Sequence, residues 1–369
     1  MDLGFTEAQY KLHDITLFNM QMAGMLIGGL IWGVLGDKKG RVSVLFGSIL
    51  MYSLANIANA FVTSLEMYGA MRFIAGVGLA GELGAGITLV AETMHKDKRG
   101  YGTMIIVSVG ALGAVCAYLV GDNFSWKTAY IIGGGMGMLL LALRAGAFES
   151  GMFKQIQHHK THNGNLLMLV NNKKRFMKYV ACILIGLPVW FVVGVLINLS
   201  DRIVEALNPA IHIEVREAVM YSYIGLSFGD LLSGFFSQYF RSRKKVITGY
   251  LAALAITVAV YLSNHNINLP YLKIMWFLLG SATGFWALFV TNAAEQFGTN
   301  LRSTVTNTVP NFVRGAVVPI TLSFKGLMET YGTIQAAIIV GSICLILSLI
   351  AVLSVKETFS KDLDYVETL

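Results

Sequence analysis

The sequence has little charge for its length. Only 13% of its 369 residues are Asp, Glu, Lys or Arg, whereas 55% are hydrophobic and the mean hydropathy is +0.63. One soluble core of this length does not need so much apolar surface. The shortage of charge therefore excludes an ordinary soluble protein and predicts a protein embedded in a lipid bilayer.

Cysteine is also scarce. The three cysteines lie inside apolar runs, where neither a disulfide framework nor a metal-ligand spacing is present. His158, His159 and His162 lie close together in a polar stretch, but no cysteine or carboxylate framework accompanies them. We interpret the cysteines as packing residues and the histidines as part of a solvated loop, and we expect no metal and no cofactor.

The net charge of +7 does not indicate a nucleic-acid partner, because the basic residues fall in short clusters between apolar runs. A membrane helix needs about 20 apolar residues. Runs of that size lack the alternation of strands, and backbone groups in lipid must bond within their own segment, so the runs predict helices. The expected spans are 15–35, 42–62, 67–93, 101–121, 127–148, 178–199, 218–239, 246–263, 271–293, 303–327 and 333–354.

Lysine and arginine predict the orientation, since loops rich in these residues stay in the cytoplasm. Basic clusters occupy alternate connections, so we expect the N-terminus to face outward and the C-terminal tail to be cytoplasmic. Trp126 and Trp276, at predicted outer helix starts, are expected in an interfacial aromatic belt. The basic clusters lie within 38–41, 96–99, 144–178 and 241–245.

Two similar segments indicate an internal repeat. A glutamate precedes an arginine by seven residues after the third span and again after the ninth, as Glu92 with Arg99 and Glu295 with Arg302. The long polar connection between the fifth and sixth spans is the natural boundary. We therefore predict an N-terminal lobe (1–148), a cytoplasmic central loop (149–177) and a C-terminal lobe with a short tail (178–369).

Three motifs resemble the major facilitator superfamily. GVLGDKKGR, residues 33–41, fills every fixed position of the family's loop signature after its second helix. RFIAGVGLAGE, residues 72–82, is similar to the fourth-helix pattern of an arginine followed by a glycine ladder. Residues 294–315 resemble the loop and eleventh helix of bacterial metabolite and proton symporters related to sugar porters. The copy of the signature in the second half is degraded, with Gln238 where an aspartate would stand.

The resemblance implies an all-α integral membrane protein with the major facilitator fold, two pseudo-symmetric helical lobes. Family members have twelve helices, whereas about eleven are expected here, and the signature loop follows the first span. The resemblance therefore implies that this sequence lacks the family's first helix. It also implies a multi-pass protein of the bacterial inner membrane, surrounded by lipid and expected to be a monomer.

Ionisable side chains deep in a bilayer are costly, so each one requires a reason. Counting along the spans at about 1.5 Å per residue places Glu82, Asp230 and Arg314 near mid-depth. Arg314 would hold an anionic substrate group, and a desolvated carboxylate would carry a proton. For Asp230 the alternative to proton transfer is that it only neutralises the charge of Arg314. For all three residues the alternative to a transport role is a structural ion pair. Further candidates for the cavity lining are Trp190, Trp286, Asn292 and Asn311.

A second group of charged and glycine residues is expected to gate the transporter. Most lie at predicted cytoplasmic helix ends, where charge pairs hold lobes together. The resemblance implies that the signature residues stabilise the outward-facing state; the alternative is a role in topology and solubility only. The predicted gating residues are Gly33, Asp37, Lys38, Gly40, Arg41, Arg72, Glu92, Arg99, Glu295 and Arg302.

These features favour a secondary transporter over an enzyme, because no catalytic group appears on a sizeable outer loop. We expect proton-coupled uptake of a small organic solute by alternating access: an organic anion or zwitterion because of Arg314, or a sugar. Efflux of a drug or metabolite is less favoured, since the family's antiporters often carry a glycine-proline pair in the fifth helix and span 101–121 has no proline. A truncated, non-transporting or sensory homologue is the other alternative.

Overall fold

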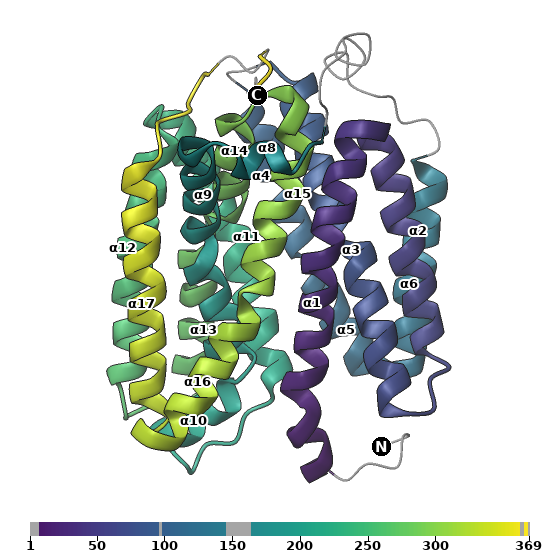
Figure 1. The fold of residues 1–369 in the computed structure, drawn as a ribbon. Helices are drawn as coiled ribbons and strands as arrows, with labels where there is room; N and C mark the ends of the chain where they lie inside the picture. Colours follow the sequence, from purple (N-terminus) through teal and green to yellow (C-terminus); the bar gives the residue numbers. More distant parts are fainter. Residues whose placement is uncertain (1–6, 96–97, 145–163, 362–364, 368–369) are drawn as a thin grey trace.

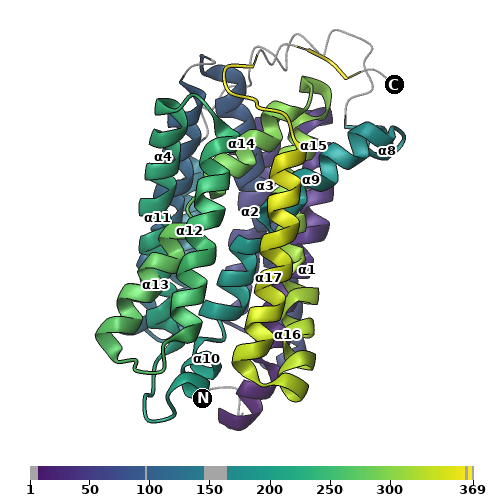
Figure 2. The same cartoon turned by 90° about the vertical axis from the view of Figure 1, so that its left-hand side faces the viewer.

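The computed structural model describes all residues except 1–6, 96–97, 145–163, 362–364 and 368–369. Its helices run side by side in one bundle, and the described residues contain no strand (Figure 1). The residues after the last helix lie at one end of the bundle, near the end of α1 (Glu7–Lys39) and the start of α15 (Thr299–Gly315) (Figures 1 and 2). We call this end the tail end and the opposite one the far end.

The first five predicted spans are helices that pack together in one half of the bundle. Serine side chains begin two of them: the Ser64 hydroxyl accepts a hydrogen bond from the Met67 N–H, and Ser125 does the same for Thr128. Span 101–121 is divided at Leu112. Besides α1, the helices are α2 (Arg41–Asn59), α3 (Leu65–Thr93), α4 (Arg99–Ala111), α5 (Gly113–Asn123) and α6 (Trp126–Leu143).

Three of the six later spans are interrupted. The sixth changes from α9 to the π-helix η1 after Pro188, the ninth breaks at Gly284, and the tenth breaks at Ala316. The elements are α8 (Leu167–Val170), α9 (Lys173–Phe191), η1 (Val192–Ile197), α10 (Ser200–Leu207), α11 (Val215–Tyr239), α12 (Arg243–Ser263), α13 (Leu269–Thr283), α14 (Trp286–Gln296), α15, α16 (Val317–Tyr331) and α17 (Thr333–Ser354).

All eleven apolar runs are therefore helical. Within the described residues, nine helical segments are long and apolar enough to cross a membrane. The spans formed by α11 and by α15 with α16 do not meet that threshold; α15 is rich in buried serine, threonine and asparagine. One detail of the prediction is wrong: Trp276 is fully buried against the core of the second half and does not face the interface.

Glycines allow the helices of the first half to approach closely. A Cβ atom built on Gly28 would lie 2.3 Å from the Val77 carbonyl oxygen, and one on Gly76 would lie 2.2 Å from that of Gln21. Small residues at such positions let membrane helices pack backbone to backbone. Gly76, in the glycine ladder of residues 72–82, therefore has a packing role. Gly86 does not share this role, because it has nothing within 4 Å of an added Cβ.

The two halves meet along two lines of helix contact. In the first seam, α1 packs on α15; in the second seam, α4 packs on α11. The Asn311 amide of α15 donates to the Ala80 carbonyl of α3 at 2.8 Å, and the Ser227 hydroxyl of α11 donates to the Ser108 carbonyl of α4 at 2.8 Å. The seams bring residues more than a hundred positions apart into contact. The predicted boundary at 149–177 and its histidines fall largely outside the described residues.

Candidate transport site and gate

A cavity of about 780 Å³ lies between the two halves of the bundle. The first half contributes side chains of α3, α4 and α6, and the second half contributes α9, η1, α11, α14 and α15. Most of the wall is apolar, with a few polar and charged groups, which is the usual composition of a small-molecule site. Its polar and aromatic lining consists of Glu82, Arg144, Trp190, Tyr223, Trp286 and Arg314.

Arg314 is the main cationic group on the second-half wall of this cavity. Its guanidinium carbon lies 5.4 Å from the ring centre of Trp286 and 5.9 Å from that of Trp190. Its Nη1 donates to Asn311 Oδ1 at 2.9 Å, and within the described residues it has no ion-pair partner. The rings and the amide orient the guanidinium and leave donors available to a ligand.

Glu82 lies on the first-half wall. Its Oε1 is 3.5 Å from Arg144 Nη2, and the Tyr52 hydroxyl is a further hydrogen-bond partner. Both charged side chains remain partly exposed, 26% for Glu82 and 33% for Arg144. The sequence analysis counted Arg144 only in the basic cluster of 144–178. The signal that marks it is its position directly after α6, from where a long side chain reaches back into the cavity.

Asp230 does not have the place expected for it. It is fully buried, does not line the cavity and forms no ion pair with Arg314. Instead its Oδ1 accepts a hydrogen bond from the Ala287 N–H at 2.9 Å, at the start of α14. The first backbone N–H groups of a helix have no partner within it, so a carboxylate stabilises them. Asp230 thus stabilises the start of α14, whose first residue is Trp286, after the break that follows α13.

Of the two predicted asparagines, only Asn311 is connected to the cavity, because it orients Arg314 and ties α15 to α3. Asn292 is not part of the lining. Its Oδ1 accepts from the Thr358 hydroxyl at 3.1 Å, near the tail end. The prediction for Asn292 was wrong because the break at Gly284 shifts α14 away from the register of a continuous helix.

The first seam is closed at the tail end by Asp37 of α1. Its Oδ1 accepts from the Ser303 N–H at 3.1 Å, and its Oδ2 accepts from the Thr304 N–H and hydroxyl at 2.8 and 2.6 Å. These donors lie on α15, in the other half. At Gly33, an added Cβ would lie only 3.0 Å from the Thr304 Cα, so glycine allows the approach.

Arg41, Glu92 and Arg302 form a buried charge cluster beside Asp37. Glu92 Oε1 lies 2.8 Å from Arg41 Nη2 and 3.3 Å from Arg302 Nη1. Arg41 Nη2 also donates to the Thr299 carbonyl at 3.3 Å. One carboxylate therefore joins an arginine from each half, as the gating prediction requires, and it does so out of contact with water.

The second seam has a related but neutral arrangement. The side chain of Gln238 reaches the start of α4, so close that a Cβ atom added to Gly100 would lie 2.0 Å from Gln238 Nε2. This Nε2 is buried and has no hydrogen-bond partner among the described residues. Next to it, Arg243 Nη2 lies 3.2 Å from Glu295 Oε1. Glu295 thus pairs within its own half. Sequence reasoning did not single out Arg243, although its pairing with Glu295 parallels that of Arg41 with Glu92.

The four remaining predicted gating residues differ in position and contacts. Gly40 has φ 105°, a conformation that favours glycine, and makes the turn from α1 to α2. Lys38 is exposed and joins no ion pair in the described structure. Arg99 is buried and donates to the Lys361 carbonyl at 3.3 Å. Arg72 is at the far end, 3.2 Å from the Tyr130 hydroxyl, so its assignment to the same gate was wrong.

The C-terminal tail covers the tail end (Figure 2). Glu357 accepts hydrogen bonds from the Ser242 hydroxyl and from the Arg243 N–H. Burial alone would raise the pKa of Glu357, but these bonds and those from the Phe359 and Thr358 N–H groups hold the pKa below its ordinary value. Further along, the Tyr365 carbonyl accepts from the Thr299 N–H at 2.9 Å.

The far end is less tightly closed. A cavity of about 260 Å³ lies there between the halves, lined by Arg72 and Tyr68 on one side and by Asn198, Asp201 and Thr321 on the other. The buried charged contacts that cross between the halves lie at the tail end. The two ends therefore differ in how firmly the halves are joined.

A family model described as Major Facilitator Superfamily matches residues 1–318. The chain belongs to this superfamily. It is therefore a multi-pass membrane transporter and not an enzyme, and the resemblance seen in the loop and helix motifs is confirmed.

Two curated relatives in the superfamily are bacterial transporters from Acinetobacter baylyi (strain ATCC 33305 / BD413 / ADP1). The niacin transporter NiaP is 39% identical over 115 residues, which are 30% of this chain and 26% of that protein. The cis,cis-muconate transport protein is 24% identical over 376 residues, 96% of this chain and 89% of its own length. Both names describe carriers of small organic solutes.

Among solved structures, the proton:xylose symporter XylE bound to 6-bromo-6-deoxy-D-glucose aligns with a TM-score of 0.74. The alignment covers 98% of this chain and 90% of that one at 15% identity. At this identity the likeness shows the fold alone, which is the all-α fold of the major facilitator transporters.

Proposed function

We propose that this transporter takes up a small organic anion together with a proton, by alternating access across a bacterial inner membrane. In this proposal the protein acts as a monomer with its tail end in the cytoplasm. The observation that carries the substrate class is Arg314, a guanidinium on the wall of the central cavity with no ion-pair partner in the described structure.

A carboxylate is the ligand that best suits this group. Guanidinium forms paired, charge-assisted hydrogen bonds to a carboxylate, and a buried cation without a counter-charge gains most from an anionic ligand. Trp190 and Trp286 meet edge to face at 6.2 Å beside it and would stack on a flat, conjugated molecule. The names of the two A. baylyi relatives, for niacin and cis,cis-muconate, both denote flat carboxylic acids.

Glu82 is the proposed proton carrier. It faces the same cavity, its pairing with Arg144 is loose at 3.5 Å, and both side chains are partly exposed. When Glu82 takes a proton, Arg144 loses its counter-charge and becomes free to attract an anion. Binding of the proton and of the anion would then favour each other, which is what coupled uptake requires.

Alternating access is supported by the difference between the two ends. Buried charges join the halves at the tail end, whereas a cavity separates them at the far end. This arrangement corresponds to a state closed toward the predicted cytoplasm. The positive-inside pattern of the loops supports that assignment of sides.

The proposal is tested by uptake of radiolabelled nicotinate, cis,cis-muconate and xylose into proteoliposomes, with and without an inward proton gradient. We expect the gradient to drive uptake of at least one carboxylate and not of xylose. Arg314→Lys should reduce that uptake at least about tenfold, because one bidentate contact of about 1.5–3 kcal/mol is lost.

Arg241→Lys is the matched control, since Arg241 is exposed in the turn before α12 and does not line the cavity. Glu82→Gln should retain exchange of the carboxylate across the membrane but lose its response to the gradient. Unchanged carboxylate uptake in Arg314→Lys, or transport of xylose with no carboxylate transport, would reject the anion proposal.

A further inference from the structure

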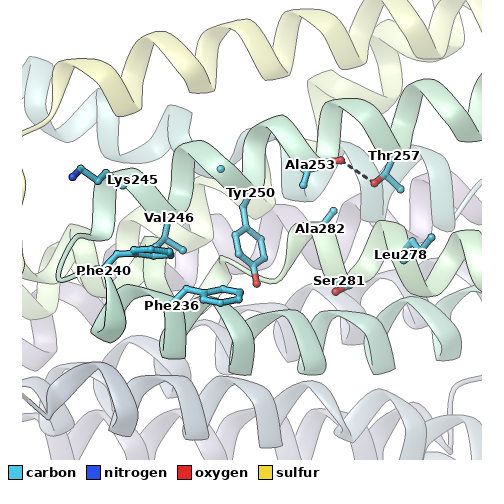
Figure 3. Close-up of a pocket in the computed structure, with 11 residues that line it drawn as sticks. Phe236, Phe240, Lys245, Val246, Tyr250, Ala253, Thr257, Leu278, Ser281 and Ala282 are labelled. Atoms are coloured by element: carbon cyan, nitrogen blue, oxygen red, sulfur yellow. Dashed lines mark hydrogen bonds between the residues drawn. The ribbon is translucent and has the colours of Figure 1, made fainter.

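A second cavity, of about 650 Å³, lies on the outer side of the second half and is unrelated to the central site (Figure 3). It runs along α12, and α11 and α13 form its other wall. Figure 3 shows Tyr250 pointing from α12 into this space. Phe236 on α11 and Phe240 directly after α11 lie side by side near one end, and Leu278 and Ser281 on α13 lie near the other. We call it the α12 groove.

The groove has the shape of a slot for a long apolar chain. Its walls consist of aromatic, aliphatic and small side chains, and Gly249 in its middle has nothing within 4 Å of an added Cβ. From Lys245 to Thr257, both lining residues, α12 rises about 18 Å at about 1.5 Å per residue. That length is close to one leaflet, half of a hydrocarbon core of about 30 Å.

One end of the groove carries a positive charge. Lys245 lines it at the tail end, beside the turn that begins α12 (Figure 3). Two neighbouring basic residues are engaged elsewhere, because Arg243 pairs with Glu295 and the Lys244 ammonium donates to the Leu353 and Val355 carbonyls. A third, Arg241, is exposed and does not line the groove. Lys245 is exposed and forms no ion pair within the described residues, so its ammonium is available to an anionic group.

We propose that the α12 groove is a binding site for one anionic phospholipid of the leaflet at the tail end. An acyl chain lies along α12 over Gly249, and the phosphate group rests beside the Lys245 ammonium. Basic side chains at the membrane surface next to an apolar cleft are the chemistry that anionic lipids recognise. The single charge at one end and the one-leaflet depth favour a lipid over a second copy of this chain.

The groove also contacts the break between α13 and α14 in the second half of the bundle. The Tyr250 hydroxyl donates to the Gly229 carbonyl at 2.9 Å, and its ring meets Phe285 edge to face at 6.2 Å. Phe285 lies in the break between α13 and α14. A bound acyl chain would restrain Tyr250 and thereby stabilise the second half of the transporter.

The test measures lipid retention and melting temperature of the purified full chain in detergent. Phosphatidylglycerol and phosphatidylcholine with the same acyl chains are added separately, and bound lipid is counted by native mass spectrometry. We expect phosphatidylglycerol to raise the melting temperature more than phosphatidylcholine does. Lys245→Ala should abolish that difference, and Gly249→Trp should abolish retention of both lipids by filling the groove.

Gly326→Trp is the matched control, because Gly326 on α16 is also exposed with nothing within 4 Å of its Cβ. It should bind lipid as the unmodified chain does. Equal stabilisation by both lipids in the unmodified chain, or equal retention in the two tryptophan variants, overturns the proposal. So does a disulfide-linked dimer of Gly249→Cys, which would assign the groove to a second copy. Neither the lipid retention nor the melting temperature depends on which substrate is transported.

Discussion

The two seams that close the tail end occupy equivalent positions in the repeat but use different chemistry. In the first seam the Asp37 carboxylate accepts three hydrogen bonds from Ser303 and Thr304 of the other half. In the second seam the neutral Gln238 occupies the corresponding place next to Gly100, with a buried donor that has no described partner. The first seam is held by charged groups, whereas the contacts described across the second seam are neutral, as in the Ser227–Ser108 hydrogen bond.

The charge clusters differ in the same direction. Glu92 pairs with an arginine of each half, while Glu295 pairs with Arg243 of its own half and accepts from the Thr358 hydroxyl of the tail at 2.8 Å. Hydrogen bonds to charged groups contribute about 1.5–3 kcal/mol, roughly twice those between neutral groups. Separating the halves at the first seam should therefore cost more free energy than separating them at the second. The first seam should control opening of the tail end.

The largest expected effect comes from Glu92→Gln. Removing one partner of a buried ion pair costs about 3–5 kcal/mol. Here Arg302 and Arg41 both lose the Glu92 carboxylate, and Arg41 keeps Asp37 at 3.5 Å. Labelling of a cysteine at Ser303, in a variant without the native cysteines, should become at least about a hundredfold faster because the first seam opens.

Glu295→Gln is the comparison for that experiment. It leaves only Arg243 without its carboxylate, in the second half, so labelling at position 303 should change little although the melting temperature falls. Equal acceleration in the two variants would show that the seams are not distinct.

Asp37→Asn should weaken the first seam to a smaller degree. The amide oxygen still accepts hydrogen bonds from α15, but the charge assistance is lost and the NH2 group faces the Thr304 donors. We expect a cost of about 1.5–3 kcal/mol and faster labelling at position 303. A cysteine at Ser108 reports the second seam and should show no change.

Gln238→Asp would make the second seam more like the first. A carboxylate near the first turn of α4 is favourable by about 0.3–1 kcal/mol. It would accept hydrogen bonds at the start of α4 as Asp37 accepts them on α15. Labelling of the cysteine at Ser108 should slow about two- to fivefold. Faster labelling would indicate that the shorter side chain leaves a gap and that Gln238 is itself the better fit.

The smallest effect concerns the tail that lies over both seams. Because the pKa of Glu357 is lowered in the folded chain, its stabilising contribution is complete above the unfolded value of about 4.3 and is lost as the pH falls through the folded value. A spin label on the exposed Lys356 should therefore become mobile only when the pH falls below the ordinary titration range of a glutamate. Glu357→Gln should be mobile already at neutral pH, whereas Glu214→Gln, at the exposed far end, should match the unmodified chain.

The helices were largely predictable, because hydropathy and the absence of strand alternation suffice for membrane spans. The gate was predictable in part: a repeated Glu and Arg spacing identified Glu92, Glu295 and Arg302, and all three lie in buried ion pairs. The spacing pattern could not predict which arginine each glutamate pairs with. Glu92 crosses between the halves and Glu295 does not, and this depends on how α15 approaches α1.

The cavity was less predictable for a related reason. Depth was counted along continuous helices, but breaks at Gly284 and Ala316 rotate the residues that follow. Asn292 was therefore assigned to a cavity that it does not line, while Trp286, the first residue of α14, does line it. Asp230 lies on the unbroken helix α11, and depth along that helix could not show that its carboxylate accepts from the Ala287 N–H. Arg144 was missed because its Cα lies beyond the helix and only its side chain reaches back.

The most direct test of the gate is the distance between spin labels on Lys38 and Lys356, which are exposed at the tail end on opposite halves. Without substrate, electron–electron double resonance should give one short, narrow distance, and Glu92→Gln should add a longer population. A distribution that is already long and broad in the unmodified chain, or one that Glu92→Gln leaves unchanged, would contradict closure of the tail end by the charged seam.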